Sequence, residues 1–239
     1  MLVKTKAIVI SSLKYREADL IVKCFTQSSG LKSYLLRNIL KSKKGKLRAS
    51  LFQPLTHLEL EANHKDKGTL ESLREAKIRY HFQSLHTDVV KSSIVLFLSE
   101  ILRNSIQEEE ENISLFQFLE SATIWLDTST DIANFHLLFL LNLTQHLGFY
   151  PDSSGKALPY FNLLEGTFEP IAVHLHCYND SRISLLKKLL GTNFDALAQI
   201  KLNQNDRTAF LTFLLQYYEV HLHGFRQPRS LAVLNSIFH

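Results

Sequence analysis

The sequence predicts an α+β protein, in which a small β-barrel formed by the first 80 residues is followed by a helical domain. Three observations predict this order. Apolar and polar residues alternate through residues 1–80, the apolar spacing becomes helical further on, and the net charge changes sign. Residues 1–80 contain 17 Lys or Arg and 7 Asp or Glu, a net charge of +10, whereas residues 81–239 contain 10 and 16, a net charge of −6.

The first domain is assigned from alternating patterns separated by turn signals. Ile8 and Ile10 share one face of the first strand, and Leu58 and Leu60 share one face of the fourth. Five short strands with basic loops are typical of a closed barrel of the oligonucleotide-binding (OB) type. The predicted strands cover residues 4–12, 19–26, 31–37, 55–61 and 70–80, and a short helix is expected within residues 41–51.

The second domain, residues 81–239, is assigned from helical spacing. Val90, Ile94, Phe97 and Ile101 recur with the helical period, which predicts a helix over residues 87–107. Residues 131–147 are apolar nearly all round, as in a buried central helix. Further helices are expected at residues 112–127, 181–190, 206–223 and 230–238. An irregular insert, with short strands near residues 160–164 and 167–171, is expected at about 149–180 because Pro and Gly recur there.

Composition excludes several classes of protein. The chain is 45% hydrophobic and 21% charged, values typical of globular proteins and not of disordered ones. Two cysteines, Cys24 and Cys177, are too few for a disulfide framework or a four-thiolate zinc site. No apolar run is long enough for a membrane helix, and the N-terminus does not match a signal peptide. We therefore expect a soluble, cytoplasmic protein.

The chain contains no recognisable catalytic motif. It has no phosphate-binding loop, dinucleotide fingerprint, CxxC pair or HExxH motif. The cluster His174, His176, Cys177 and Asp180 is the stronger of two candidates for a metal site, ahead of the pair His221 and His223, whose side chains do not face the same way on a helix. A metal-dependent hydrolase would use His174, His176 and Asp180. With eleven histidines in the chain such pairs arise easily, and no second ligand pair faces this one. We therefore predict a protein that is not an enzyme and that has no metal or other cofactor.

The basic character of residues 1–80 predicts binding to a polyanion. Each lysine or arginine there is able to neutralise one phosphate and release a counterion. Tyr15, Phe25 and Tyr34 offer rings for base stacking, although core packing is the competing role for Phe25 and Tyr34. An RNA-binding OB protein is the alternative to a DNA-binding one. The candidate DNA-binding residues are Lys14, Arg16, Lys23, Lys32, Arg37, Lys41, Lys43, Lys44, Lys46, Arg48, Lys65 and Lys67.

Several motifs occur in a recognisable order along the chain. The N-terminal part contains the segment Tyr15-Arg16-Glu17-Ala18-Asp19-Leu20-Ile21, followed by Phe25-Thr26, Gly30, Phe52-Gln53-Pro54-Leu55 and Leu73-Arg74-Glu75. The helical part contains the segment LLFLLNLTQHLGFYPD. In the order and spacing of these motifs the chain resembles, over its whole length, the RecO family of bacterial recombination mediators.

The resemblance implies a non-catalytic DNA repair protein. Such a protein would bind single- and double-stranded DNA, anneal complementary strands and, with RecR, help to load the recombinase RecA onto coated single strands. It would work in the cytoplasm, associated with the nucleoid. Its helical domain would bind the acidic, apolar C-terminal tail of single-stranded-DNA-binding protein.

The chain departs from the family pattern at two places. Many members have four zinc-binding cysteines in the segment that here contains only Cys177, so we expect a metal-free lobe in place of the zinc module. Arginines at the start of the central helix of some relatives are Asn134 and Phe135 here. We therefore expect Arg226 and Arg229 to bind the partner tail. The alternatives are that this pair caps a helix or pairs with the acidic run at residues 108–111.

Overall fold

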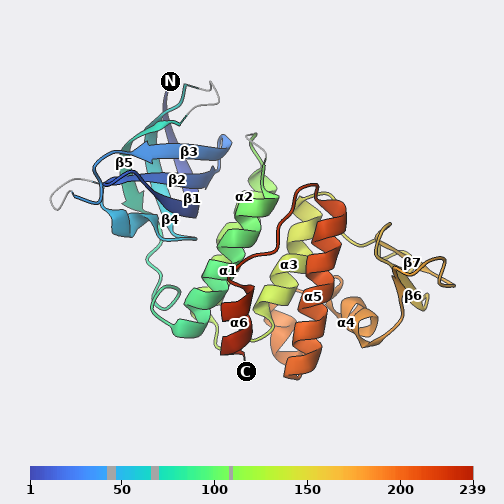
Figure 1. Ribbon diagram of the computed structural model, residues 1–239. Helices are drawn as coiled ribbons and strands as arrows, with labels where there is room; N and C mark the ends of the chain where they lie inside the picture. The colour runs from blue at the N-terminus through green and yellow to red at the C-terminus, as the bar shows by residue number, and fades with distance from the viewer. Residues whose placement is uncertain (42–46, 66–69, 108–109, 239) are drawn as a thin grey trace. The chain divides into compact units, whose positions relative to one another are not determined.

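The computed structural model describes residues 1–41, 47–65, 70–107 and 110–238 (Figure 1). The chain folds as two compact units, Met1–Thr128 (unit 1) and Ser129–His239 (unit 2). Unit 1 contains the N-terminal sheet together with the first two helices, and unit 2 contains the remaining helices and a small second sheet.

The N-terminal sheet confirms the predicted five strands and the α+β class. Its order is β3-β2-β1-β4-β5, with antiparallel pairing between all neighbours. A register shift between Val9 and Ser11 interrupts the pairing of the first two strands. The strands are β1 (Leu2–Tyr15), β2 (Asp19–Thr26), β3 (Gly30–Leu36), β4 (His57–Asn63) and β5 (Ser72–Ile78).

The strand ends differ from the predicted ones at the residues that matter for binding. Lys14 and Tyr15 belong to β1 and not to the following loop, because the strand pairs with β2 as far as Tyr15 opposite Asp19. Arg37 lies just beyond β3 and not on it. The short helix expected within residues 41–51 corresponds to the 3₁₀ turn η1 (Ala49–Phe52).

One face of the sheet encloses an apolar core. Alternate residues of each strand point to this face, so that Val22 and Cys24 of β2 are fully buried while Ile21 and Lys23 are only partly so. Burial raises the pKa of the Cys24 thiol far above its usual value. The core cluster consists of Ala7, Val9, Leu20, Val22, Cys24, Tyr34, Leu36, Ile39, Phe52, Leu58, Leu60, Ala62 and Ala76.

Two helices pack on part of the sheet's outer face within unit 1. They are α1 (Val89–Ser105) and α2 (Ile113–Thr128). Phe25 of β2 stacks on Phe116 of α2 with ring centroids 6.4 Å apart, and the Ser99 hydroxyl of α1 donates to the carbonyl of Ile10 at 2.7 Å. The core of unit 1 therefore continues from the sheet into these helices.

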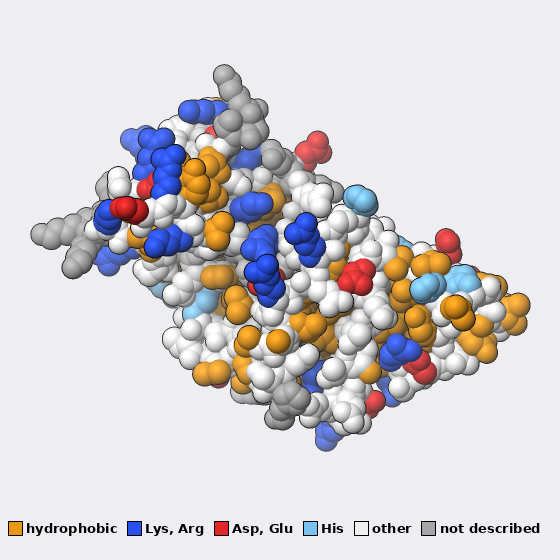
Figure 2. Space-filling view, in the orientation of Figure 1, with side chains coloured by type: hydrophobic (Ala, Val, Ile, Leu, Met, Phe, Trp, Pro, Cys, Tyr) orange, Lys and Arg blue, Asp and Glu red, His pale blue; other side chains and the backbone are white. Residues whose placement is uncertain are grey.

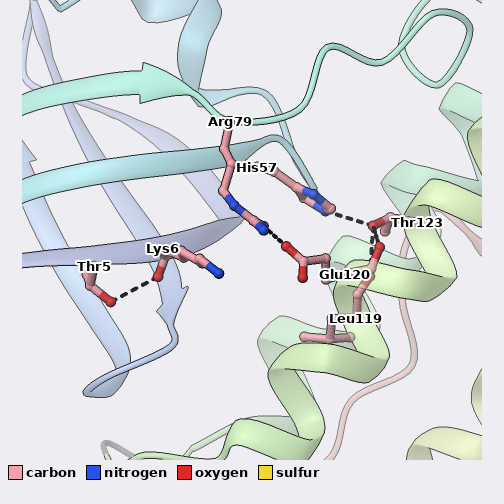
Figure 3. Close-up of polar contacts among 7 residues, drawn as sticks. All are labelled: Thr5, Lys6, His57, Arg79, Leu119, Glu120 and Thr123. Atoms are coloured by element: carbon pink, nitrogen blue, oxygen red, sulfur yellow. Dashed lines mark hydrogen bonds and ion pairs between the residues drawn. The ribbon is translucent and has the colours of Figure 1, made fainter.

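Polar contacts join β4 and the end of β5 to α2 (Figure 3). The His57 Nε2 atom lies 2.8 Å from the Thr123 hydroxyl, and Arg79 forms an ion pair with Glu120. At the end of α2, the Asp127 carboxylate accepts hydrogen bonds from three consecutive backbone N–H groups, those of residues 83–85. These contacts fix the segment between the sheet and α1.

Unit 2 is built around the buried helix α3 (Phe135–His146), which lies beside α5 (Gln204–His221) (Figure 1). The Tyr218 hydroxyl of α5 donates to the carbonyl of Leu140 at 2.8 Å. Of the helices in the described ranges, none has the length and apolar character needed to cross a bilayer. The other helical elements are α4 (Ser181–Leu189), η2 (Phe194–Gln199) and α6 (Leu231–Ile237).

The insert expected at about residues 149–180 contains a small antiparallel sheet of order β7-β6-β8. Its strands are β6 (Tyr160–Asn162), β7 (Thr167–Glu169) and β8 (Cys177–Tyr178). The first two confirm predicted strands. Strand β8 and the 3₁₀ helix η2 were not predicted, because two-residue strands and single 3₁₀ turns leave no periodic signal.

Candidate nucleic-acid interface

Two hydrogen bonds hold the β1–β2 turn against the segment that follows β3. The Leu40 amide donates to the carbonyl of Ala18 at 3.0 Å, and the Asn38 amide donates to the Asp19 carboxylate at 2.8 Å. Figure 2 shows lysine and arginine side chains gathered over the N-terminal sheet. The two joined segments bring together four predicted cations: Lys14, Arg16, Arg37 and Lys41.

The β1–β2 turn combines a charged group with an aromatic ring. Arg16 has a left-handed backbone (φ 54°), a conformation that costs a residue with a side chain roughly 1 kcal/mol. Its guanidinium lies over the Tyr15 ring, 5.2 Å from the centroid, and 37% of Tyr15 is exposed. A cation next to a ring suits a nucleic acid, which offers phosphates to the one and bases to the other.

Lys23 and Lys32 lie on opposite faces of the sheet. Lys23 belongs to the outer face, directly between Ser11 of β1 and Ser33 of β3. Lys32 pairs with the buried Cys24, points to the core side of β3 and is only 9% exposed. Of the two lysines, only Lys23 is placed to contact a ligand on the outer face.

The remaining predicted cations of unit 1 fall into two groups. Arg48 and Lys65 are exposed, on the segments that precede η1 and follow β4, and Lys41 forms an exposed ion pair with Glu17 at 3.1 Å. Even with this pair, the two joined segments hold four cations against two carboxylates, those of Glu17 and Asp19. Four predicted residues lie outside the described ranges: Lys43, Lys44, Lys46 and Lys67.

The stacking role suggested for Tyr34 is wrong. Its ring is fully buried and its hydroxyl lies 2.9 Å from His64 Nε2, because Tyr34 has the inward parity of β3. Burial raises the pKa of the Tyr34 hydroxyl well above its usual value. Phe25 is also fully buried, against Phe116, so core packing is its role. Of these three rings, Tyr15 alone is exposed enough to stack on a base.

The outer face formed by β1, β4 and β5 is charge-balanced. It lines a groove of about 410 Å³ that contains three lysines and three glutamates. Exposed ion pairs join Lys4 to Glu61 at 3.6 Å and Lys77 to Glu75 at 3.7 Å. The net positive charge of the sheet is therefore concentrated on the part formed by β1, β2 and β3.

Two features of the sheet surface were missed at the sequence level. Leu13 of β1 is 63% exposed on the same face as Lys23, and Arg74 of β5 lines a groove of about 620 Å³ together with Arg37 and Lys65. The signal for Leu13 was the continued alternation of Ser11, Leu13 and Tyr15. That signal is weak because Ser11 is polar, which leaves only two apolar residues, Leu13 and Tyr15, in the alternating set.

In unit 2, Arg226 and Arg229 are exposed on the segment after α5. Gly224 ends the preceding turn with φ 77°, which a residue with a side chain adopts only at a cost. A separate groove of about 530 Å³ is lined by apolar residues, by the cations Arg182, Lys188 and Lys201, and by one carboxylate, that of Asp206. Unit 2 therefore has two cationic places able to receive a carboxylate.

The candidate metal cluster has no coordinating geometry. The rings of His174 and His176 are 5.9 Å apart, and His174 Nδ1 accepts a hydrogen bond from the His176 backbone amide at 3.1 Å. Asp180 caps α4 and holds the Arg182 guanidinium. Within the part of the chain that the structure describes, no three His, Cys, Asp or Glu side chains are grouped to hold a metal ion.

Comparison with family models defines the class of protein. The model described as "Recombination protein O N terminal" matches residues 1–82, and the model described as "Recombination protein O C terminal" matches residues 86–231. The five-stranded sheet and the helical region each fall within one of these matches. The chain is thus a recombination protein.

Full-length relatives make the assignment specific. The chain is 56% identical to the DNA repair protein RecO of Christiangramia forsetii, 50% to that of Flavobacterium psychrophilum and 37% to that of Bacteroides fragilis. Each match covers 100% of both chains. The chain belongs to the RecO family of DNA repair proteins. Membership confirms the prediction of a non-enzymatic DNA repair and recombination protein.

Proposed function

We propose that the chain binds single- and double-stranded DNA through residues 1–80. The observation that carries the proposal is the asymmetric charge of the sheet. Arg16, Arg37 and Lys41 lie on segments joined by hydrogen bonds, whereas the β1–β4–β5 face is neutralised by its own glutamates. A polyanion is attracted electrostatically to the segments that contain these three cations and not to the β1–β4–β5 face.

The sheet acts in this proposal as a closed barrel of the OB type. Support comes from residues that join its two edge strands. The Glu71 amide donates to the carbonyl of Ser33 at 2.8 Å, and the Leu35 amide donates to the carbonyl of Glu71 at 3.0 Å. Closure between β3 and the start of β5 removes the free edges of the sheet. In this scheme residues 1–80 form the DNA-binding domain, and residues 81–239 form the helical domain with a metal-free insert at about 149–180.

In the cell, DNA binding of this kind serves recombinational repair. The chain would anneal complementary strands and, together with RecR, help to load RecA onto single strands coated with single-stranded-DNA-binding protein. It would act in the cytoplasm, on the nucleoid. Membership of the RecO family supports this role, and a binding site without catalytic machinery is what it requires.

The dependence of DNA affinity on salt tests the electrostatic part. Replacing Lys43, Lys44 and Lys46 with Ala should flatten the salt slope by about three units for a duplex and about two for a single strand. The matched control replaces Lys4, Lys6 and Lys77, three cations of the balanced face, and should leave the slope unchanged. Equal slopes in the wild type and both triple variants would refute the assignment of electrostatic DNA binding to residues 1–80.

We place the partner tail on Arg226 and Arg229, with Phe225 and Leu231 beside them for its apolar end. Two parallel hydrogen bonds let an arginine hold a carboxylate. An acidic peptide with an apolar C-terminus should bind the double variant Arg226→Ala, Arg229→Ala more weakly than wild type.

The groove cations of unit 2 provide the comparison for the tail site. The variant Lys188→Ala, Lys201→Ala removes the same charge from the 530 Å³ groove. If this lysine pair, and not the arginine pair, weakens peptide binding, the tail site lies in the groove and the placement on Arg226 and Arg229 is wrong.

A further inference from the structure

An apolar row crosses the open outer face of the N-terminal sheet. Leu13 of β1 lies directly opposite Ile21 of β2, which lies directly opposite Leu35 of β3. Leu13 is 63% exposed, and the other two are half-buried. Side chains directly opposite on antiparallel strands lie within about 5.5 Å of one another, so the three form one continuous apolar strip.

Polar and aromatic groups border this row on both sides. The next set of opposite residues is Ser11, Lys23 and Ser33, which supplies two hydroxyls and one ammonium group. On the other side of the row Tyr15 follows Leu13 on the same face, with the Arg16 guanidinium over its ring. Directly opposite Tyr15 is Asp19, whose carboxylate accepts a hydrogen bond from the Asn38 amide. The row therefore lies between hydrogen-bonding groups and an exposed ring.

The row continues into the groove at the junction of β3 and β5. Leu35 belongs to both, because it also lines the 620 Å³ groove. Three cations, Arg37, Lys65 and Arg74, share that groove with one carboxylate, that of Glu71, which accepts a hydrogen bond from the Lys65 amide at 2.8 Å. Apolar surface for bases and positive charge for phosphates thus follow one another along a single path.

We infer that the row of Leu13, Ile21 and Leu35, with Tyr15, is a base-contact platform for single-stranded DNA, whose backbone continues past Arg37 and Arg74 in the groove. The inference rests on the proposed DNA binding and adds a preference for single strands. Bases of a single strand expose their faces to apolar and aromatic side chains, whereas a duplex hides them in its stack. The surrounding cations favour a polyanion over a neutral apolar partner.

Affinity for a labelled thymidine oligonucleotide and for a duplex of equal length tests the platform. Tyr15→Ala should weaken single-strand binding at least about fivefold, the equivalent of one lost base stack. Leu13→Ser should weaken it about threefold. Both variants should leave duplex affinity and the salt slope unchanged, because no phosphate contact is lost. Leu2→Ala, which alters an exposed leucine at the other end of β1, is the control and should bind both ligands as wild type does.

The groove has its own matched pair of variants. Arg74 and Lys77 are both exposed β5 cations paired with a glutamate, at 3.0 Å and 3.7 Å, but only Arg74 lines the 620 Å³ groove. Arg74→Ala should lower the single-strand salt slope by about 0.7, whereas Lys77→Ala should not change it.

The outcomes separate this inference from the function on which it rests. If Tyr15→Ala and Leu13→Ser bind single strands as wild type does while the lysine triple variant binds weakly, the platform is refuted and DNA binding by this domain stands. If those two variants keep DNA affinity but lose binding to RecR, the row is a protein-docking surface and the platform is again refuted. If neither they nor the lysine triple variant lose affinity, the proposed function itself fails.

Discussion

Lowering the pH should destabilise unit 1 through His57, whose imidazole is buried in its uncharged form between the sheet and α2. Thr123 has one hydroxyl hydrogen, which it donates within its own helix to the carbonyl of Leu119 at 2.7 Å. Its oxygen must then accept from His57 Nε2–H at 2.8 Å (Figure 3). His57 Nδ1 is buried and has no hydrogen-bond partner among the described residues. Protonation would add a hydrogen at this atom, where no acceptor is available.

The size of the effect follows from the pKa of His57. Burial, the Arg79 guanidinium and His86 lower this pKa from its ordinary value near 6.5 to about 4. The folded state therefore resists a proton that the unfolded state takes up, and stability is lost as pH falls through the window between the two values. Between about pH 7.5 and about pH 5 the loss is about 2 kcal/mol. A domain of ordinary stability has only about 5–15 kcal/mol to lose.

Trp125 provides the assay. It is the single tryptophan of the chain and lies on α2 in the same unit, so its fluorescence reports the unfolding of the structure around His57. Urea unfolding at the two pH values should show the full loss for wild type, and a loss smaller by about 2 kcal/mol for His57→Gln, which does not titrate. His81→Gln, which alters an exposed imidazole of the same unit, is the control and should behave as wild type.

The loss of stability between the two pH values is compared within each variant, so the packing that His57→Gln removes at both pH values cancels. The ring of His57 packs edge-on against Phe82 at 4.9 Å, so the variant is expected to be less stable at both pH values. Only the difference between the two values reports the proton. Equal pH dependence in wild type and His57→Gln, or an imidazole that titrates near its ordinary value in the folded protein by NMR, would refute the reasoning.

Three further predictions concern buried groups. Asp127→Asn should destabilise unit 1 by about 2–3 kcal/mol in tryptophan-detected unfolding, because the charged carboxylate that accepts three backbone N–H groups is lost. Gly166→Ala should destabilise unit 2 in thermal circular dichroism by more than Gly148→Ala. Both glycines have positive φ, but only at Gly166 would the new Cβ lie 2.5 Å from the hydroxyl of Tyr217. Burial and the Arg207 guanidinium lower the pKa of His136 to about 3. The free energy of unfolding of unit 2 should therefore be about 2 kcal/mol smaller at about pH 5 than at neutral pH, and His136→Gln should reduce that loss.

Periodicity predicted the elements because each has one buried face. The alternation that includes Leu58 and Leu60 and the helical spacing of Val90, Ile94, Phe97 and Ile101 both reflect burial against a core, and β4 and α1 follow them within a few residues. The end of β1 was missed for the same reason. Beyond Ile10 the residues of β1 are no longer buried, so its last part lacks the run of apolar residues that marks a strand packed on a core.

The position of each cation along the chain was evident from the sequence, but its face on the sheet was not. Lys23 and Lys32 look alike in sequence, and only the pairing of β2 with β3 places one outward and the other beside Cys24. The register shift between Val9 and Ser11 also decides which β1 residues share a face with Lys23. A one-residue slip in register moves every side chain to the other face, so composition alone does not predict which face a lysine occupies.

The net charge of +10 for residues 1–80 therefore understates how strongly the sheet is polarised. Glu59, Glu61 and Glu75 are gathered on the β1–β4–β5 face, where they neutralise lysines that no nucleic acid need contact. Among the described cations, Arg16, Lys23, Arg37, Lys65 and Arg74 lie around the apolar row and the adjoining groove. A phosphate backbone is drawn to that side whatever its sequence, and contacts of this kind fix the orientation of the strand without reading its bases. In the proposed platform, the apolar row and Tyr15 would contact the faces of the bases, which all four bases share, so binding would not depend on base sequence.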